Sequence, residues 1–126
     1  MTLGELLREG MSALGQDKQL EAQLLLAKVL KKERAMLLAY TDKTVTAEEE
    51  AAFRQMLDER MKHAPLQYLL GAANFYGRDF MVNEKVLIPR FDTEVLTARA
   101  LEILKGKPPA KIADICTGSG AVAVTL

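Results

Sequence analysis

Cysteine and histidine are scarce in this sequence, and that scarcity limits the chemistry open to it. Cys116 is the only cysteine, so no disulfide can form within the chain, which fits a reducing cytoplasm. His63 is the only histidine, and these two side chains cannot supply the usual ligand set of a zinc site. We therefore expect no metal site, a solvated or structural His63 at a helix end, and a Cys116 packed under a turn.

An excess of charge and long apolar runs are also missing. Lysine plus arginine number 17, as do aspartate plus glutamate, so the chain has no overall field to attract nucleic acid or an anionic membrane. A local patch can still form. No apolar run approaches the roughly 20 residues that cross a bilayer, and charged residues interrupt the leucines of Met1–Gly10, so we expect no signal peptide. These features predict a cytoplasmic protein without membrane contact or direct nucleic-acid binding.

What the sequence does contain, in its first 64 residues, is a helical pattern. Thr2 and Glu5 have the spacing of a capping box, as do Thr46 and Glu49, and Asp17 is predicted to cap a helix between them. A short helix is expected at residues 33–39. We expect these helices to pack as a small bundle through three apolar stripes: Leu3, Leu6, Leu7 and Leu14; Leu20, Leu24, Ala27 and Leu30; Ala52, Phe53, Met56, Leu57 and Met61.

The pattern changes after Pro65. Residues 65–71 predict a short helix that ends at Gly71. Residues 74–76 and 80–82 are rich in strand-forming side chains, and residues 77–79 between them predict a hairpin turn. A further helix is expected from Asp92 or Thr93, either of which can cap it, to Leu104.

The last segment has the pattern of a strand, a glycine-rich turn and a helix. Residues 112–115 predict the strand, residues 116–120 the turn and residues 121–126 the helix, which is the opening unit of a doubly wound α/β domain. One such unit cannot bury its own faces, so we expect the chain to end inside a domain. The turn suits a phosphate or the carboxylate of an amino-acid-like cofactor. Taken alone, it does not separate a dinucleotide from S-adenosylmethionine (SAM), or either from a turn without a ligand.

Three segments in order resemble the bacterial protein-glutamine N5-methyltransferases that modify release factors. The family's patterns are P-x-x-Y-L-x-G followed by F and F-x-V, then L-I-P-R-P-[ED]-T-E, then D-L-[GC]-T-G-[ST]-G. The matching segments here are residues 65–71 with Phe75, Phe80 and Val82; residues 87–94; and residues 114–121.

The resemblance implies a mainly α N-terminal helical bundle, a β-hairpin linker and the truncated start of an α/β Rossmann-like SAM-dependent methyltransferase domain. The implied boundaries are 1–72 for a substrate-binding bundle, 73–90 for the linker and 91–126 for the start of the methyltransferase domain. The partner it implies is a class 1 peptide chain release factor, and the reaction is methylation of the glutamine in its Gly-Gly-Gln motif. The family's catalytic Asn-Pro-Pro-Tyr motif is expected beyond residue 126, so no catalytic residue is assigned in this chain. We expect the 126-residue chain alone to bind SAM weakly or not at all.

The resemblance also implies a set of cofactor contacts. The turn supplies SAM contacts, Asp114 shapes that turn, and the segment before the predicted helix lies near the pocket. The implied residues are Cys116, Thr117, Gly118, Ser119, Gly120, Asp114, Arg90, Thr93 and Glu94.

Alternatives remain at this point. The segment Asp92-Thr93-Glu94 resembles the corresponding segment of the branch that methylates release factors, and not that of the branch that methylates a ribosomal protein. Phe91 departs from the family pattern, because it replaces the usual proline and so frees the backbone φ at this position. A non-catalytic protein-binding module and a nucleotide-dependent oxidoreductase are the other readings. The Asn-Pro-Pro-Tyr motif would separate the methyltransferase from both.

Overall fold

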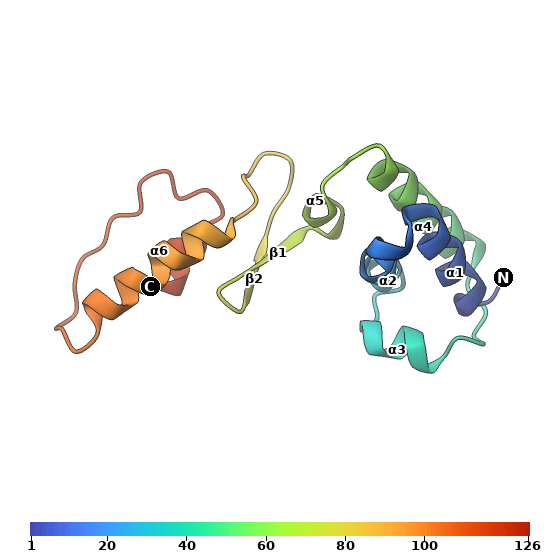
Figure 1. The fold of residues 1–126 in the computed structure, drawn as a ribbon, viewed down its shortest axis with the longest axis horizontal. Helices are drawn as coiled ribbons and strands as arrows, with labels where there is room; N and C mark the ends of the chain where they lie inside the picture. Colours follow the sequence, from blue (N-terminus) through green and yellow to red (C-terminus); the bar gives the residue numbers. More distant parts are fainter. The chain divides into compact units, whose positions relative to one another are not determined.

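A computed structural model describes all 126 residues, which form two compact units, Met1–Leu70 and Gly71–Leu126 (Figure 1). The chain is mostly helical, with one two-stranded antiparallel hairpin. None of the helices combines the length and apolar character needed to cross a membrane. The first unit contains α1 (Leu3–Leu14), the 3-10 helix η1 (Gln16–Lys18), α2 (Gln19–Leu30), α3 (Arg34–Ala39), α4 (Ala47–Met61) and α5 (Leu66–Leu70), and the second contains β1 (Ala72–Phe75), β2 (Arg78–Met81), α6 (Phe91–Leu104) and α7 (Ala121–Thr125).

Both predicted capping boxes are present. The backbone N–H of Glu5 donates to the Thr2 hydroxyl at 3.3 Å, and the Thr2 N–H donates to the Glu5 carboxylate at 2.8 Å. Thr46 and Glu49 repeat this arrangement at 3.2 and 2.8 Å. The hydrogen bonds from the backbone and then the side chain of Thr2 lower the pKa of Glu5. Two of the helices therefore begin where local chemistry satisfies their free N–H groups.

The first unit packs α1, α2 and α4 around one apolar core, to which α3 and α5 contribute. Gly10 permits close packing, since a Cβ built there would lie 2.5 Å from Cζ of Phe53. The absence of a side chain on α1 thus lets the Phe53 ring of α4 reach the helix backbone. The buried members of the core are Leu3, Leu6, Leu7, Leu25, Leu26, Leu37, Val45, Phe53 and Leu57.

Two guanidinium–carboxylate pairs join α4 to its neighbours. Arg54 binds Glu9 of α1 through two hydrogen bonds of 2.7 and 3.0 Å, and Arg60 binds Glu21 of α2 at 2.7 and 3.2 Å. The hydrogen bond from Arg54 lowers the pKa of Glu9, and the bond to Glu21 raises the pKa of Arg60. Two hydrogen bonds fix the orientation of each guanidinium group relative to its carboxylate more firmly than one bond would.

The stripe predicted for α2 is confirmed only in part, since Ala27 and Leu30 pack partly buried against the core but the fully buried positions are others. Leu20 is 52% exposed, whereas Ala22, Leu25 and Leu26 are fully buried. Asp17 does not cap the helix, because residues 16–18 form a 3-10 turn and α2 begins only at Gln19. A helix that contacts α1, α4 and α5 buries positions on more than one face, so a single stripe describes it poorly.

The other two apolar stripes are confirmed in part. Leu3, Leu6 and Leu7 of α1 are buried, as are Phe53 and Leu57 of α4. Met61 is 49% exposed, so α4 contributes a narrower face to the core than its sequence predicts.

The hairpin of the second unit is confirmed, with a tighter turn than predicted. Ala73 pairs with Phe80 and Phe75 with Arg78, so only Tyr76 and Gly77 lie between the strands. Both have positive φ, 50° and 77°, as a type I′ turn requires. The rings of Phe75 and Phe80 meet edge to face with centroids 6.2 Å apart, and both are buried.

Helix α6 spans nearly the predicted residues, but the predicted caps, Asp92 and Thr93, are wrong. Arg90 occupies the N-cap position, and its side chain makes no capping bond. Asp92 and Glu94 lie in the first turn, where carboxylates favour the positive end of the helix.

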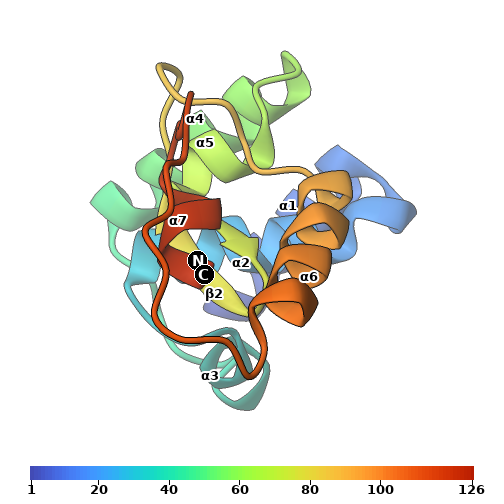
Figure 2. The same ribbon diagram turned by 90° about the vertical axis from the view of Figure 1, so that its left-hand side faces the viewer.

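No strand forms at residues 112–115, contrary to the prediction. The segment between α6 and α7 is an irregular coil (Figure 2). A parallel strand needs neighbouring strands to pair its N–H and C=O groups, and the two strands present pair only with each other. The turn and the helix that follow are formed, so only part of the predicted α/β unit is present.

Candidate functional site

A pocket of about 330 Å³ lies within the second unit, between the start of α6 and the glycine-rich turn. Its volume falls in the range of small-molecule sites. The lining comes from the coil before α6, the first turns of α6, the segment from Asp114 to Ser119, and the start of α7. It includes most of the cofactor contacts expected from the sequence: Arg90, Thr93, Asp114, Cys116, Thr117, Gly118 and Ser119.

Asp114 holds the glycine-rich turn in place. Its Oδ2 accepts a hydrogen bond from the Thr117 hydroxyl at 2.8 Å and another from the Ala123 backbone N–H at 3.2 Å. The first bond closes the loop from 114 to 117, and the second attaches the loop to α7. One carboxylate therefore sets the position of the turn relative to the helix that follows.

The backbone of the turn is open towards solvent. Cys116, Gly118 and Gly120 have φ of 60°, 58° and 81°, and a Cβ built at Gly118 would meet nothing within 4 Å. Such conformations allow a ligand to approach the backbone closely. Cys116 is exposed, so the expectation that it packs under the turn is wrong. Cys116 instead lies in a turn whose residues line the pocket.

Two of the expected contacts do not line the pocket. Glu94 lies on α6, and its carboxylate accepts a 2.7 Å hydrogen bond from the Tyr76 backbone N–H, so it joins the hairpin turn to α6. Gly120 is the N-cap residue of α7. Glu94 thus joins the hairpin turn to α6 and is absent from the lining of this pocket.

Sequence reasoning missed the apolar part of the lining. Leu87, Ile88, Pro89 and Ile115 contribute to it, as do Leu96 and Val122. Leu96 follows Thr93 by three residues on the same helix, so helical spacing could have placed it on the same face. A mainly apolar wall with a few polar groups is the usual composition of a small-molecule site.

The polar groups of the pocket differ in charge. Arg90 forms no salt bridge within the chain, so its guanidinium is available to a carboxylate or phosphate. Asp114, which carries the opposite charge, lines the same pocket. The chain has no group of three or more His, Cys, Asp or Glu side chains that could hold a metal ion. The arrangement therefore suits an organic ligand that carries charges of both signs.

Known proteins similar to this chain identify its class. Residues 5–71 match the PrmC N-terminal domain family, and this range contains most of α1 and all of α2 to α5. This match extends over more than half of the chain, and the chain therefore belongs to that family.

Individual relatives extend the similarity into the second unit. The chain is 41% identical over 130 residues to the release factor glutamine methyltransferase of Clostridium botulinum, which covers 100% of this chain and 46% of that protein. It is 42% identical over 107 residues to the protein of the same name from Bacillus anthracis, with coverages of 82% and 38%. For the Bordetella pertussis protein the identity is 43% over 108 residues, with coverages of 86% and 40%. The chain thus spans less than half the length of the curated relatives it matches.

Proposed function

We propose that the intact protein is a SAM-dependent methyltransferase that modifies the glutamine of the Gly-Gly-Gln motif in class 1 release factors at N5. The observation that carries this proposal is the pocket in which Arg90 and Thr93 meet the turn from Asp114 to Ser119. The similar proteins are release factor glutamine methyltransferases, which supports the same reaction.

The residues present fit SAM as the ligand. SAM is an amino acid derivative, so it offers a carboxylate and an ammonium group. In our proposal Arg90 and the backbone of the turn receive the carboxylate, and the apolar wall formed by Leu87, Ile88 and Leu96 covers the less polar part of the cofactor. When bound, SAM supplies a methyl group on a positively charged sulfur.

The chain's own residues then bind and position, and none of them is assigned to the transfer step. Asp114 keeps the turn in its open conformation through Thr117 and Ala123, and Glu94 holds α6 against the hairpin turn. An amide nitrogen is a poor nucleophile, so rate depends largely on how well both reactants are oriented. We further propose that residues 1–72 contact the protein substrate, 73–90 link the parts, and 91–126 open a Rossmann-like domain.

The test is transfer of a labelled methyl group from SAM to a purified release factor by the intact protein. We expect transfer to the native factor and none when the glutamine of Gly-Gly-Gln is changed to alanine. Methylation confined to nucleic acid or to small molecules would sink the proposal.

Variants of the pocket test the cofactor assignment. Removing a charge-assisted hydrogen bond costs about 1.5–3 kcal/mol, so Arg90→Ala should weaken SAM binding by about 10-fold or more in calorimetry with the intact protein. Arg99→Ala is the matched control, because Arg99 lies on α6, which begins directly after Arg90, but pairs with Glu102 and lines no part of the pocket. Equal SAM affinity in both variants would show that Arg90 does not hold the cofactor.

A further inference from the structure

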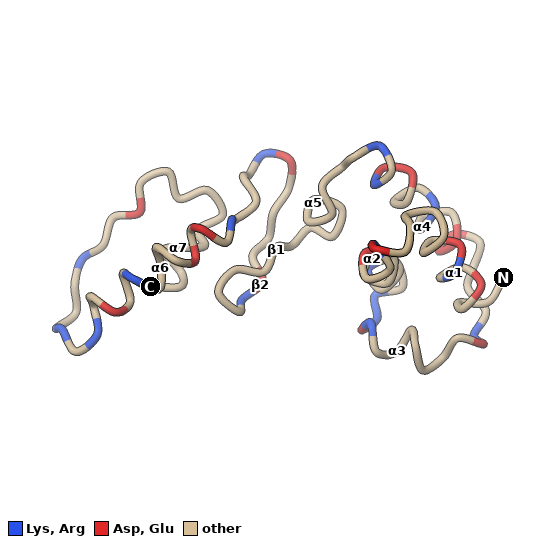
Figure 3. Tube along the Cα trace, in the orientation of Figure 1, with Lys and Arg blue, Asp and Glu red and all other residues tan.

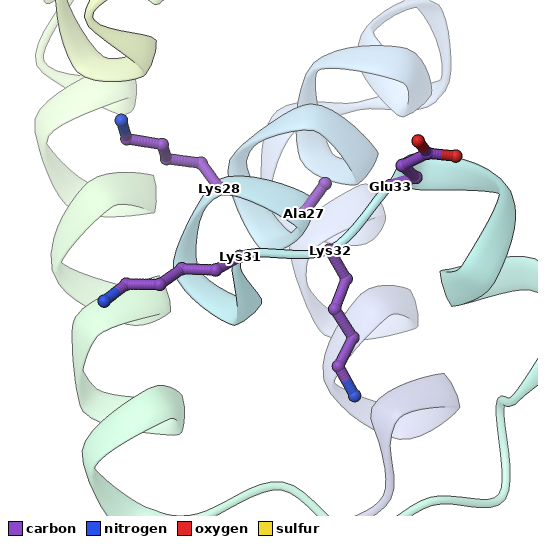
Figure 4. A pocket seen from close by; sticks show the side chains of 5 residues that line it. All are labelled: Ala27, Lys28, Lys31, Lys32 and Glu33. Carbon is purple, nitrogen blue, oxygen red and sulfur yellow. The ribbon is translucent and has the colours of Figure 1, made fainter.

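The junction between α2 and α3 carries a group of lysines that the proposed function does not use. Lys28 lies in the last turn of α2, Lys31 is the C-cap residue of that helix, and Lys32 follows. All three are exposed, and with Ala27 and Glu33 they line a shallow hollow of about 580 Å³. Figure 4 shows the lysine side chains extending away from one another and from the Glu33 carboxylate. The ammonium groups are therefore spread around the hollow and do not converge on one point.

The charges of these lysines are not neutralised within the chain, because every salt bridge of the structure involves other side chains. Residues 28–43 contain five basic and two acidic side chains, whereas α4 contains five acidic and two basic ones. Figure 3 shows basic positions where α2 gives way to α3 and acidic positions along α4, in a chain whose net charge is zero. The prediction of no direct nucleic-acid binding rests on that net charge, which averages out a local cationic patch.

The backbone conformation at Lys31 is one that lysine rarely adopts. Its φ is 52°, the left-handed conformation with which glycine normally ends a helix. A residue with a Cβ is strained there, whereas glycine is not. The helix dipole favours a cation in the last turn, which accounts for Lys28, but its effect falls off beyond that turn. Lysine at residue 31 therefore costs stability, and no ion pair of its side chain offsets that cost.

We infer that Lys28, Lys31 and Lys32, here called the α2 lysine patch, bind the phosphate backbone of a nucleic acid strand. Divergent ammonium groups do not enclose one small anion, but each can meet a different phosphate along a strand. An acidic protein partner fits less well. A stable protein interface has large apolar or aromatic side chains at its centre, and the only apolar residue of the hollow is Ala27.

The experiment is fluorescence anisotropy of short labelled RNA and DNA strands of mixed sequence, titrated with the intact protein at several salt concentrations. Binding should weaken as salt rises, and the slope of log Kd against log salt should include about 0.7 for each phosphate neutralised. Lys28→Ala/Lys31→Ala/Lys32→Ala should raise the Kd about tenfold or more at low salt and reduce that slope by about 2. This loss with either strand supports the inference, and the strand with the lower native Kd is the preferred one.

The matched control is Lys105→Ala/Lys107→Ala/Lys111→Ala, which removes the same charge from exposed lysines of the other unit that form no ion pair. We expect the control to change the Kd much less than the patch variant does. Equal losses in the two variants would show that only total charge matters and would overturn the inference. The absence of binding to both strands by the native protein would overturn it as well.

Polyglutamate tests the alternative of an acidic polypeptide. We expect it to bind more weakly than the strands at equal salt. If it binds as tightly, and the patch variant loses that binding, the partner is an acidic protein segment and the inference is wrong. None of these assays needs SAM or a release factor, so failure here leaves the proposed function untouched.

Lys31→Gly separates binding from folding. Glycine adopts a φ of 52° without strain, so this variant should unfold at a higher urea concentration than the native protein. It should nevertheless bind the strands more weakly, with a salt slope lower by about 0.7. A lysine with a merely structural role would change stability alone. Unchanged affinity and slope in this variant would therefore refute the role of Lys31 and, with it, the patch.

Discussion

The two units differ in how much of their apolar surface they bury. The first buries nine hydrophobic side chains in one cluster, fixes two helix starts with capping boxes and joins three helices by paired carboxylates and guanidinium groups. The second buries Phe75, Phe80 and Ala121 as its cluster. It leaves many large apolar side chains exposed: Met81, Leu87, Phe91, Val95, Leu96, Ile103, Ile112, Ile115 and Val124.

The difference teaches that a pocket of ligand size can be formed by a unit whose own core is small. Local hydrogen bonds set the positions of the turn and of α6, through Asp114 and Glu94, without a large buried cluster beneath them. In contrast, the helices of the first unit are held mainly by apolar burial. Stability changes should therefore be large in the first unit and small in the second.

The strongest test of this contrast truncates one buried phenylalanine in each unit. Phe53→Ala should lower the free energy of unfolding of the first unit by about 3–5 kcal/mol, because the ring is fully buried among α1 and α2 side chains. Phe75→Ala should cost about 2 kcal/mol or less, since its cluster is small and can collapse around the gap. Hydrogen exchange resolved along the chain measures both, and equal losses would refute the contrast.

Gly10→Ala should have the next largest effect. Alanine favours a helix over glycine by about 1 kcal/mol, but its methyl carbon would lie 2.5 Å from Phe53 Cζ. Overpacking of this kind costs about 1–3 kcal/mol, so a net loss of about 1 kcal/mol is expected in urea unfolding. Ser12→Ala, at an exposed position of the same helix, should be neutral or slightly stabilising. A gain at Gly10 would mean that the Phe53 ring moves freely, in conflict with a tight core.

Acid should weaken the first unit through two carboxylates. Hydrogen bonds lower the pKa of Glu5 and of Glu9 below the ordinary value of 4.5. Their contribution to stability is therefore complete above that value and is lost as the pH falls through the lower pKa of the folded state. We expect the urea concentration at the unfolding midpoint to decrease once the pH is lowered below about 4.5. Glu5→Gln/Glu9→Gln should lower the midpoint at pH 7 and flatten this dependence, whereas Glu33→Gln, at a carboxylate without an ion pair, should follow the native curve.

Sequence patterns predicted the features that depend on neighbouring residues. Both capping boxes, the short helix ended by Gly71 and the existence of the hairpin are confirmed. Each needs only contacts within a few residues. The same is true of the bond between Asp114 and Thr117, three residues apart, which holds the turn of the candidate site.

The features that failed depend on distant partners. The buried positions of α2 are set by the four α-helices it contacts, α1, α3, α4 and α5, which its own periodicity does not specify. A strand at residues 112–115 requires neighbouring strands to pair with, and none lies beside it. Likewise, the role of Glu94 depends on a hydrogen bond to Tyr76, eighteen residues earlier in the chain, that no local motif predicts.

The smallest expected effect concerns the turn of the hairpin in the second unit, where the backbone conformation of one residue is tested and not the burial of a side chain. Tyr76 has a φ of 50°, a conformation that asparagine tolerates better than tyrosine or alanine, and Asn-Gly is the favoured pair of a type I′ turn. Tyr76→Asn and Tyr76→Ala both remove the ring, so their difference isolates the backbone. We expect the Asn variant to protect the hairpin amides more than the Ala variant by about 0.5–1 kcal/mol. Equal protection in the two variants would mean that Glu94, through its bond to the residue 76 N–H, holds the turn whatever side chain it carries.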